Sequence, residues 1–224
     1  MSRDAFLARV RQAAEMGRAY RVHLLPVPEN VGYIGVSGDL CERFAAEVDA
    51  VGGQSYLVAD LAAARVALHH LLQEAGAGSA LCWRHDLLDR LGLDELLAAP
   101  GVTRHDQSTL AKLAPAEQRS MMLGCDIGIT SCDCAIAETG TLMVCSQPGQ
   151  ERASSLLPPF YVSVVERSQI VPDLLDAFKR LAAPSAALPS NVTFITGPSK
   201  TGDIELQLTT GVHGPGKWRV IVIQ

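Results

Sequence analysis

The sequence contains no long hydrophobic run. Although 48% of its 224 residues are hydrophobic, polar residues interrupt every apolar stretch before it reaches the roughly 18 residues that a membrane-spanning helix needs. In the N-terminal segment, charged residues from Arg3 to Arg11 break up the apolar positions, so there is no signal-peptide core. We therefore predict no membrane insertion and a cytoplasmic location.

Positive charge is also scarce. The chain has 19 Lys and Arg against 24 Asp and Glu, which gives a net charge of −5 and a pI near 5.7. The cations are scattered among acids rather than gathered in a patch. Nucleic acids and anionic membranes bind through such patches, so the sequence predicts neither as a partner.

The six cysteines lack the spacing of metal sites. There is no C-x-x-C pair of the zinc type and no C-x-x-C-x-x-C run of the iron–sulfur type. If the segment around Asp133 were a strand, Cys132 and Cys134 would share one face, and two thiolates alone make a poor metal site. We predict no metal and no cofactor in this chain, with Cys41 and Cys82 as small core residues.

Common catalytic motifs are absent as well. The sequence has no Walker A loop, no G-x-G-x-x-G, no H-E-x-x-H and no serine-hydrolase elbow. These absences exclude the best-known nucleotide loops, zinc proteases and serine hydrolases.

What the chain does contain is a regular alternation of helices and strands from about Asp39 onward. Apolar residues recur at helical spacing within 39–51, 61–76, 87–97 and 116–124, and again after Pro172. Short apolar runs between them predict strands, and the segment from 127 to 146 predicts two strands joined near Gly140. This alternation predicts a single three-layer α/β domain with a mainly parallel sheet.

We divide the chain into residues 1–38, an N-terminal helix with an extended lead-in, and residues 39–224, the α/β domain. The N-terminal helix is expected to pack on or beside the sheet. Ligands of parallel α/β sheets bind at the carboxyl ends of the strands, and we expect the informative motifs to lie there.

The first motif is the turn Glu138-Thr139-Gly140. A carboxylate in a tight turn can act as a base, a nucleophile or a ligand contact. Gly140 would allow a sharp turn or a close approach to a ligand. The alternative is an ordinary β-turn with a solvated glutamate.

The second motif is the segment GQER followed by SSLLP, which contains Arg152. A guanidinium at the start of a helical turn could hold a carboxylate or phosphate through two hydrogen bonds. The alternative is a surface ion pair with Glu151 or Glu166.

The third motif begins where a predicted strand ends at Thr196 and continues as GPSKTGDIE. Its backbone N–H groups, its hydroxyls and a lysine could cradle an anion. Asp203 could instead cap a helical turn, and Glu205 could be solvated. The candidate ligand-binding residues of this motif are Gly197, Pro198, Ser199, Lys200, Thr201, Asp203 and Glu205.

The fourth motif is GVHGPG, which places His213 in a loop shaped by glycine and proline before the last predicted strand. This makes it a better acid or base candidate than the other histidines. The alternative is a histidine that only bonds the backbone. Together with Glu138 it completes the catalytic candidates, and we expect all four motifs to converge on one cleft.

The ordered series AETGT, G-x-x-R with SLLP, ITGPSKTGDIE and GVHGP resembles the lactate-utilisation (LUD) domain, most specifically over residues 124–224. The chain length and the missing cluster motifs resemble its C-type subunit. The resemblance implies a fold like those of ribose-5-phosphate isomerase and the CoA transferases. It also implies a role in converting L-lactate to pyruvate with iron–sulfur partner subunits, this chain being the non-cluster component.

Two positions depart from the family pattern. Lys200 stands where the family often has arginine, which keeps the charge but loses the planar fork. Cys132 and Cys134 stand where less reactive residues are expected, so these thiols are weak candidates for chemistry that the whole family shares.

Three functions stay open at this point. The chain is a subunit of a lactate-oxidising system that binds a small anion, or a stand-alone enzyme, or a non-catalytic assembly or sensor protein. As a stand-alone enzyme it would act on an anion of the acyl-CoA or sugar-phosphate type, with Glu138 as nucleophile or base by analogy of fold.

Overall fold

The computed structural model describes residues 2–18, 36, 38–182, 189–201 and 209–224. Contacts divide the chain into two units, residues 1–34 and residues 35–224. The first unit contains helix α1 (Arg3–Arg18), and its expected packing on the sheet stays a prediction. None of the described helices is both long and apolar enough to cross a membrane.

The second unit is built on a parallel sheet of six strands. In spatial order they are β1 (Gln54–Val58), β12 (Lys217–Ile223), β7 (Phe160–Glu166), β4 (Ile127–Thr130), β2 (Ser79–Cys82) and β3 (Thr103–His105). Every neighbouring pair runs parallel. The central strand β7 is buried at all positions but its last, as expected for a strand covered on both faces. The predicted α/β class and mainly parallel sheet are confirmed.

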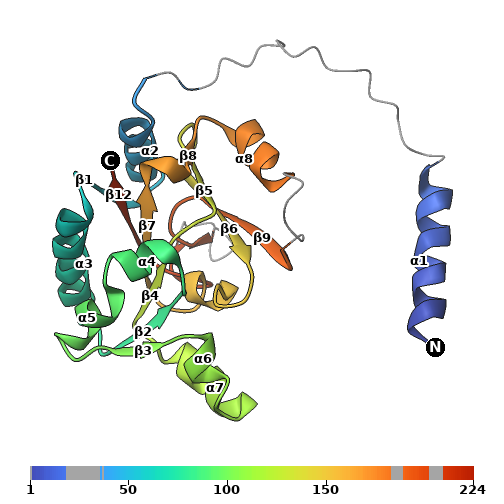
Figure 1. The fold of residues 1–224 in the computed structure, drawn as a ribbon, viewed down its shortest axis with the longest axis horizontal. Coiled ribbons are helices and arrows are strands. Elements are labelled where there is room, and N and C mark those ends of the chain that lie inside the picture. The colour runs from blue at the N-terminus through green and yellow to red at the C-terminus, as the bar shows by residue number, and fades with distance from the viewer. Residues whose placement is uncertain (1, 19–35, 37, 183–188, 202–208) are drawn as a thin grey trace. The chain divides into compact units, whose positions relative to one another are not determined.

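Helices flank the sheet, and most of them connect its strands. They are α2 (Leu40–Ala50), α3 (Leu61–Ala75), α4 (Asp86–Arg90), α5 (Leu93–Ala98), α6 (Gln107–Leu110), α7 (Pro115–Leu123) and α8 (Leu174–Leu181). The boundaries follow local chemistry: the Asp39 side chain caps α2, and Gly76, in the left-handed region, ends α3. In Figure 1, α3 and α5 lie on one side of the sheet, and α8 lies on the other.

A second, mixed sheet of four strands lies on the α8 side (Figure 1). Its strands, in order, are β8 (Ile170–Val171), β5 (Cys134–Ile136), β6 (Thr141–Ser146) and β9 (Asn191–Ile195). A short hairpin of β10 (Lys200–Thr201) and β11 (Thr209–Thr210) follows β9. The predicted pair of strands joined near Gly140 is present as β5 and β6, which run antiparallel. The first of them is shorter than predicted, because the chain leaves the central sheet after Thr130 and begins β5 only at Cys134.

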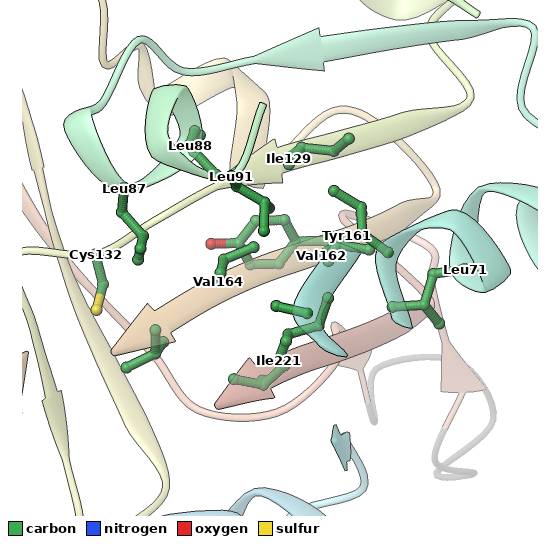
Figure 2. Packing of buried hydrophobic residues seen from close by; sticks show 14 of the residues in the cluster. Leu71, Leu87, Leu88, Leu91, Ile129, Cys132, Tyr161, Val162, Val164 and Ile221 are labelled. Atoms are coloured by element: carbon green, nitrogen blue, oxygen red, sulfur yellow. The ribbon is translucent and has the colours of Figure 1, made fainter. Parts of the chain in front are cut away.

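One predicted helix is broken. The segment 87–97 forms α4 and α5, separated by Gly92 at φ +69°. This left-handed residue cannot continue an α-helix, so the apolar periodicity runs through two short helices. Leu87 and Leu88 of α4, and Leu91 directly after it, pack over the central sheet (Figure 2).

The main hydrophobic core fills the space around the central sheet. Figure 2 shows Leu91, Ile129 and Val164 in this core, all of them fully buried. Tyr161 is 1% exposed, and because side chains alternate along β7, its ring lies on the opposite face of the sheet from Val162 and Val164. The hydroxyl of Tyr161 is 2.7 Å from Thr130 Oγ1, which satisfies a polar group at the centre of this core. Burial raises the pKa of this tyrosine.

Candidate functional site

A hollow of about 280 Å³ lies where two loops meet the start of two central strands. One loop follows β9 and contains Gly197, Pro198 and Ser199; the other precedes β12 and contains His213. The lining residues are Ser155, Leu156, Tyr161, Thr193, Phe194, Ile195, Thr196, Gly197, Pro198, Ser199, His213, Gly214, Pro215 and Trp218. We call this hollow the loop pocket.

The two loops of the pocket are hydrogen-bonded to each other. Ser199 N–H donates to the carbonyl of Pro215 at 2.9 Å, and Gly211 N–H donates to the carbonyl of Ser199 at the same distance. These bonds bring the third and fourth sequence motifs together. They also occupy the N–H of Ser199, which is therefore not free to bind an anion.

The turn of the first motif reaches the pocket through a chain of hydroxyls. Thr139 Oγ1 is 2.7 Å from Thr141 Oγ1, which is 2.7 Å from Oγ1 of Thr196 in the pocket wall. Glu138 is half-buried, and its N–H donates to the carbonyl of Pro172 at 3.0 Å. Glu138 is therefore the neighbour in sequence of a residue linked to the pocket wall, but it does not line the pocket itself.

Lys200 has a different position from the one expected. Its ammonium group donates to the carbonyl of Val51 at 2.7 Å, at the C-terminal end of α2, and it does not line the loop pocket. A cation at this end of a helix satisfies a carbonyl and the helix dipole. Thr201 is half-buried in β10. Asp203 and Glu205 lie outside the described residues.

Arg152 lies in a separate hollow of about 610 Å³. That hollow is lined by Gln107, Ser146, Gln147, Pro148, Gln150, Glu151, Arg152, Pro189 and Ser190. Arg152 is exposed, and the part of the chain that the structure describes gives its guanidinium no ion pair. Glu166, one of its expected partners, pairs with Arg90 at 2.5 Å. The second motif is thus divided, since Ser155 and Leu156 face the loop pocket and Arg152 does not.

The loop pocket lies at the amino edge of the central sheet. Tyr161 and Trp218 are the second residues of β7 and β12, and they are neighbours in the parallel register. The expectation that the motifs follow carboxyl ends was therefore wrong for the second and fourth motifs, which precede these strands. The first and third motifs follow β5 and β9, which belong to the second, mixed sheet rather than to the parallel sheet that the expectation concerned.

The carboxyl edge of the sheet carries a buried charge cluster that the sequence reading missed. Asp106, 1% exposed, accepts from Arg84 at 2.9 Å and from the hydroxyl of Ser108 at 2.7 Å. Burial raises the pKa of Asp106, but these groups, Thr109 N–H and Arg104 outweigh it and hold the pKa below its ordinary value. The charge of Asp106 is thus balanced by arginines within the cluster, and these contacts hold the C-terminal end of β3 in place.

Unlike Asp106, Glu151 is a shielded acid without a charged partner in the described part of the chain. Both of its carboxylate oxygens are shielded from solvent and lack a hydrogen-bond partner of ordinary geometry among the described residues. Burial raises the pKa of this group, in part against nearby N–H groups of Glu151 and Gly149. Its carbonyl, by contrast, accepts the indole N–H of Trp83 at 2.9 Å.

The cysteines are separated by the fold. Cys132 belongs to the main core, whereas Cys134 belongs to a smaller cluster under the second sheet, so the prediction that they share one strand face was wrong. Cys41 and Cys82 are fully buried core residues, as predicted. Within the described ranges, no three His, Cys, Asp or Glu side chains are grouped closely enough to hold a metal ion.

Trp218 and Tyr161 are pocket residues that the sequence reading missed. Tyr161 lies near the start of β7 and Trp218 near the start of β12, and neither was among the candidate residues. The one available signal was position: Trp218 follows the Gly-rich loop by two residues, so its side chain was bound to lie beside whatever that loop encloses.

Comparison with known proteins gives several relatives that share one name. Lactate utilization protein C of Halalkalibacterium halodurans is 34% identical, covering 70% of this chain and 68% of that protein. The protein of the same name from Shouchella clausii is 35% identical, covering 70% and 67%. That of Bacillus licheniformis is 28% identical over 100% of this chain and 96% of its own.

Among solved structures, a DUF162 family protein from Deinococcus radiodurans superposes with a TM-score of 0.60 at 22% identity. The match covers 83% of this chain and 96% of that one, and it shows a shared fold. The model of the LUD domain family matches residues 41–223, which include both sheets and the loop pocket. The chain therefore belongs to the LUD domain family.

Proposed function

We propose that this protein is a component of a bacterial L-lactate utilisation system, in which L-lactate is oxidised to pyruvate together with iron–sulfur partner proteins. Within that system it is the subunit without a cluster. The observation that carries the proposal is the loop pocket, assembled from the two most specific motifs in a chain whose relatives are named lactate utilization protein C.

The size of the pocket supports a small ligand. Pockets for drug-sized molecules occupy about 300–1,000 Å³, whereas this one measures about 280 Å³. Its polar groups are hydroxyls, the imidazole of His213 and an indole N–H, set among apolar side chains. A hydroxy acid or keto acid of a few carbons suits both its size and its lining.

The thiols support a role without a cluster. A cluster needs several accessible thiolates on one site, and the six cysteine side chains here are buried in three different hydrophobic clusters. In this proposal the electrons of lactate oxidation pass through the partners.

A deletion strain tests the proposal. We expect loss of growth on L-lactate with normal growth on glucose, restored by the wild-type gene. A tagged protein expressed in its own host should co-purify with iron-containing partners. Normal growth on L-lactate without the gene would contradict the proposal. Turnover of an acyl-CoA by the purified protein alone, lost in Glu138→Gln, would favour a stand-alone enzyme instead.

We also propose that Arg152 contacts an anion in its own hollow. Because a hydrogen bond to a charged group is worth about 1.5–3 kcal/mol, Arg152→Ala should weaken anion binding roughly 10- to 150-fold. Lys200→Ala should cost less affinity, since its ammonium is already bound to Val51. Calorimetry with L-lactate, pyruvate, acetyl-CoA and a sugar phosphate measures this. Equal anion affinity in wild type and Arg152→Ala would show that Arg152 does not contact the anion.

A further inference from the structure

The indole N–H of Trp218 is a buried donor without an acceptor. The residue is 1% exposed, and none of the described residues accepts a hydrogen bond from its Nε1. Leaving such a donor unsatisfied costs about 1–3 kcal/mol, and a buried tryptophan N–H usually has a partner. The acceptor for this group is therefore expected from outside the described chain.

This donor belongs to the wall of the loop pocket. Trp218 lines the pocket together with both loops. A Cβ built on Gly53 would lie 2.7 Å from Cε3 of the indole, so the six-membered ring packs against the start of β1. Nε1 lies on the opposite edge of the indole and faces away from that contact.

The second tryptophan provides a contrast within the same molecule. Trp83 is also 1% exposed, but its Nε1 donates to the carbonyl of Glu151 at 2.9 Å. One buried indole N–H is thus satisfied by the protein, and the other is not. Of the two buried indoles, Trp218 is therefore the one whose N–H could donate to a partner from outside the described residues.

The remaining lining limits what the acceptor can be. The pocket wall includes Leu156, Phe194, Ile195, Pro198 and Pro215, with no Lys or Arg among its lining residues in the described ranges. A carboxylate buried against such a wall would lack a cation and would be costly. An uncharged oxygen that only accepts, such as a carbonyl, meets a single N–H donor without that cost.

Three hydroxyls of the pocket wall are already engaged. Thr193 donates to Asn191 at 2.7 Å, and Ser155 donates to the carbonyl of Arg152 at 3.1 Å. Thr196 is linked to Thr141. Of the side-chain donors in the wall, the indole N–H of Trp218 is the one that is both buried and unpaired among the described residues.

We propose that the loop pocket binds a short 2-oxo acid whose keto oxygen accepts a hydrogen bond from Trp218 Nε1. The alkyl group lies against the apolar wall, and the carboxylate lies on the open side beside the exposed His213. A 2-hydroxyl would also bring a proton that needs an acceptor, so the keto form is preferred over the hydroxy form. The choice of a 2-oxo acid rests on the proposed function, whereas the unpaired donor is an observation of the structure and does not depend on that function.

Two matched substitutions test this assignment. Trp218→Phe removes an unpaired N–H and keeps an aromatic ring, so the free protein should melt at the same temperature or higher. Trp83→Phe removes a paired N–H and leaves the Glu151 carbonyl without its donor, so the protein should melt at a lower temperature. Calorimetry with pyruvate should show about tenfold weaker binding to Trp218→Phe than to wild type, and unchanged binding to Trp83→Phe.

Propionate, which has the same chain length as pyruvate but no keto group, is the ligand control. It should bind more weakly than pyruvate, and equally to wild type and Trp218→Phe. The chain has two tryptophans, so Trp83→Phe also isolates the emission of Trp218, which pyruvate should change on saturation. This second readout holds even if Trp218→Phe does not fold.

The inference is overturned if pyruvate does not bind, if Trp218→Phe binds it as tightly as wild type, or if Trp218 emission does not change on saturation. Its failure differs from failure of the proposed function. Loss of growth on L-lactate without pyruvate binding would overturn only the pocket assignment. Trp218-dependent pyruvate binding in a protein that is dispensable for growth on L-lactate would overturn only the proposed function.

Discussion

Two glycines let the β5–β6 turn and the pocket loop after β9 pack against the C-terminal part of α2. Gly140, at φ +62°, has its missing Cβ 2.6 Å from the backbone nitrogen of Val48, and Gly197, at φ +82°, has its own 2.7 Å from the carbonyl of Val51. Both sites are left-handed and both are closed by backbone, so they require glycine for two independent reasons. The bond from Lys200 to Val51 fastens the second loop at the same place.

Gly140→Ala should therefore destabilise the protein by more than the strain of placing alanine at a positive φ. Gly76 is the matched control, because its φ of +58° is similar but nothing lies within 4 Å of its missing Cβ. We expect Gly76→Ala to cost about 1 kcal/mol from backbone strain, and Gly140→Ala about 2–4 kcal/mol once overpacking is added. Urea unfolding of the two variants measures this. Equal costs would mean that the turn moves away from α2 without penalty.

The sequence predicted the loops of the pocket better than its walls. Glycine, proline and serine in the third and fourth motifs indicated shaped turns, and Ser199 and His213 do line one pocket. Trp218 could not be chosen from sequence, because an unpaired N–H is a property of three-dimensional surroundings. Arg152 could not be excluded from the pocket either, because a one-turn helix, η1 (Arg152–Ser155), decides which of its side chains face which hollow.

At the scale of whole elements, a single carboxylate ties together the starts of two parallel strands. Asp126 precedes β4, and its Oδ2 accepts from the N–H groups of Gly78 and Ser79 at 2.9 Å each and from the Ser79 hydroxyl at 3.0 Å. These residues lead into β2, whose Ala80 pairs with Ile127 of β4. The carboxylate thus fixes the register of this pair at the amino edge.

The stability that this carboxylate contributes should depend on pH. Burial raises the pKa of Asp126, but the bonds from Gly78 and Ser79 outweigh it and leave the pKa below its ordinary value of 3.8. Because the folded-state pKa is the lower one, the stabilisation is complete above about pH 4 and is lost as pH falls through the folded-state value.

Asp126→Asn tests this, since it keeps an acceptor and removes the charge. The difference in unfolding free energy between wild type and variant should be largest near neutral pH and should shrink in acid. Urea titrations from pH 7 to pH 3 give that difference directly, with other acids cancelling between the two proteins. A difference that does not change with pH would assign the effect to shape rather than charge.

The order of helices and strands was largely predictable, but which sheet a strand joins and which face of a helix is buried were not. Alternating apolar periods indicated the central strands and the helices between them, because each period reports which face is buried. The second sheet was not separated from the first, because β4 and β5 are equally apolar and only three residues lie between them. In α8, Leu174, Leu175 and Phe178 share a face, but this face is exposed and the small Ala177 is buried.

At the scale of the whole molecule, the fold buries its six thiols in three separate hydrophobic clusters. Cys41, Cys82 and Cys132 lie in the main core, Cys134 and Cys145 under the second sheet, and Cys125 in a third cluster. Burial raises the pKa of every one, to about 12 for Cys82 and Cys145 and about 11 for Cys125 and Cys134. Protonated thiols are poor nucleophiles and poor metal ligands.

We therefore predict that the native protein hides its thiols and carries no intrinsic iron–sulfur cluster. A disulfide reagent at pH 8 should find almost no fast-reacting thiol in the folded protein and six after denaturation, because access requires unfolding. Protein purified without oxygen should be colourless and free of stoichiometric iron and acid-labile sulfide. A brown protein that loses its iron when Cys132 and Cys134 are replaced by serine would show instead that the chain opens to bring the two clusters' thiols onto one site. This chain would then carry electrons itself, and the proposed role as the subunit without a cluster would fail.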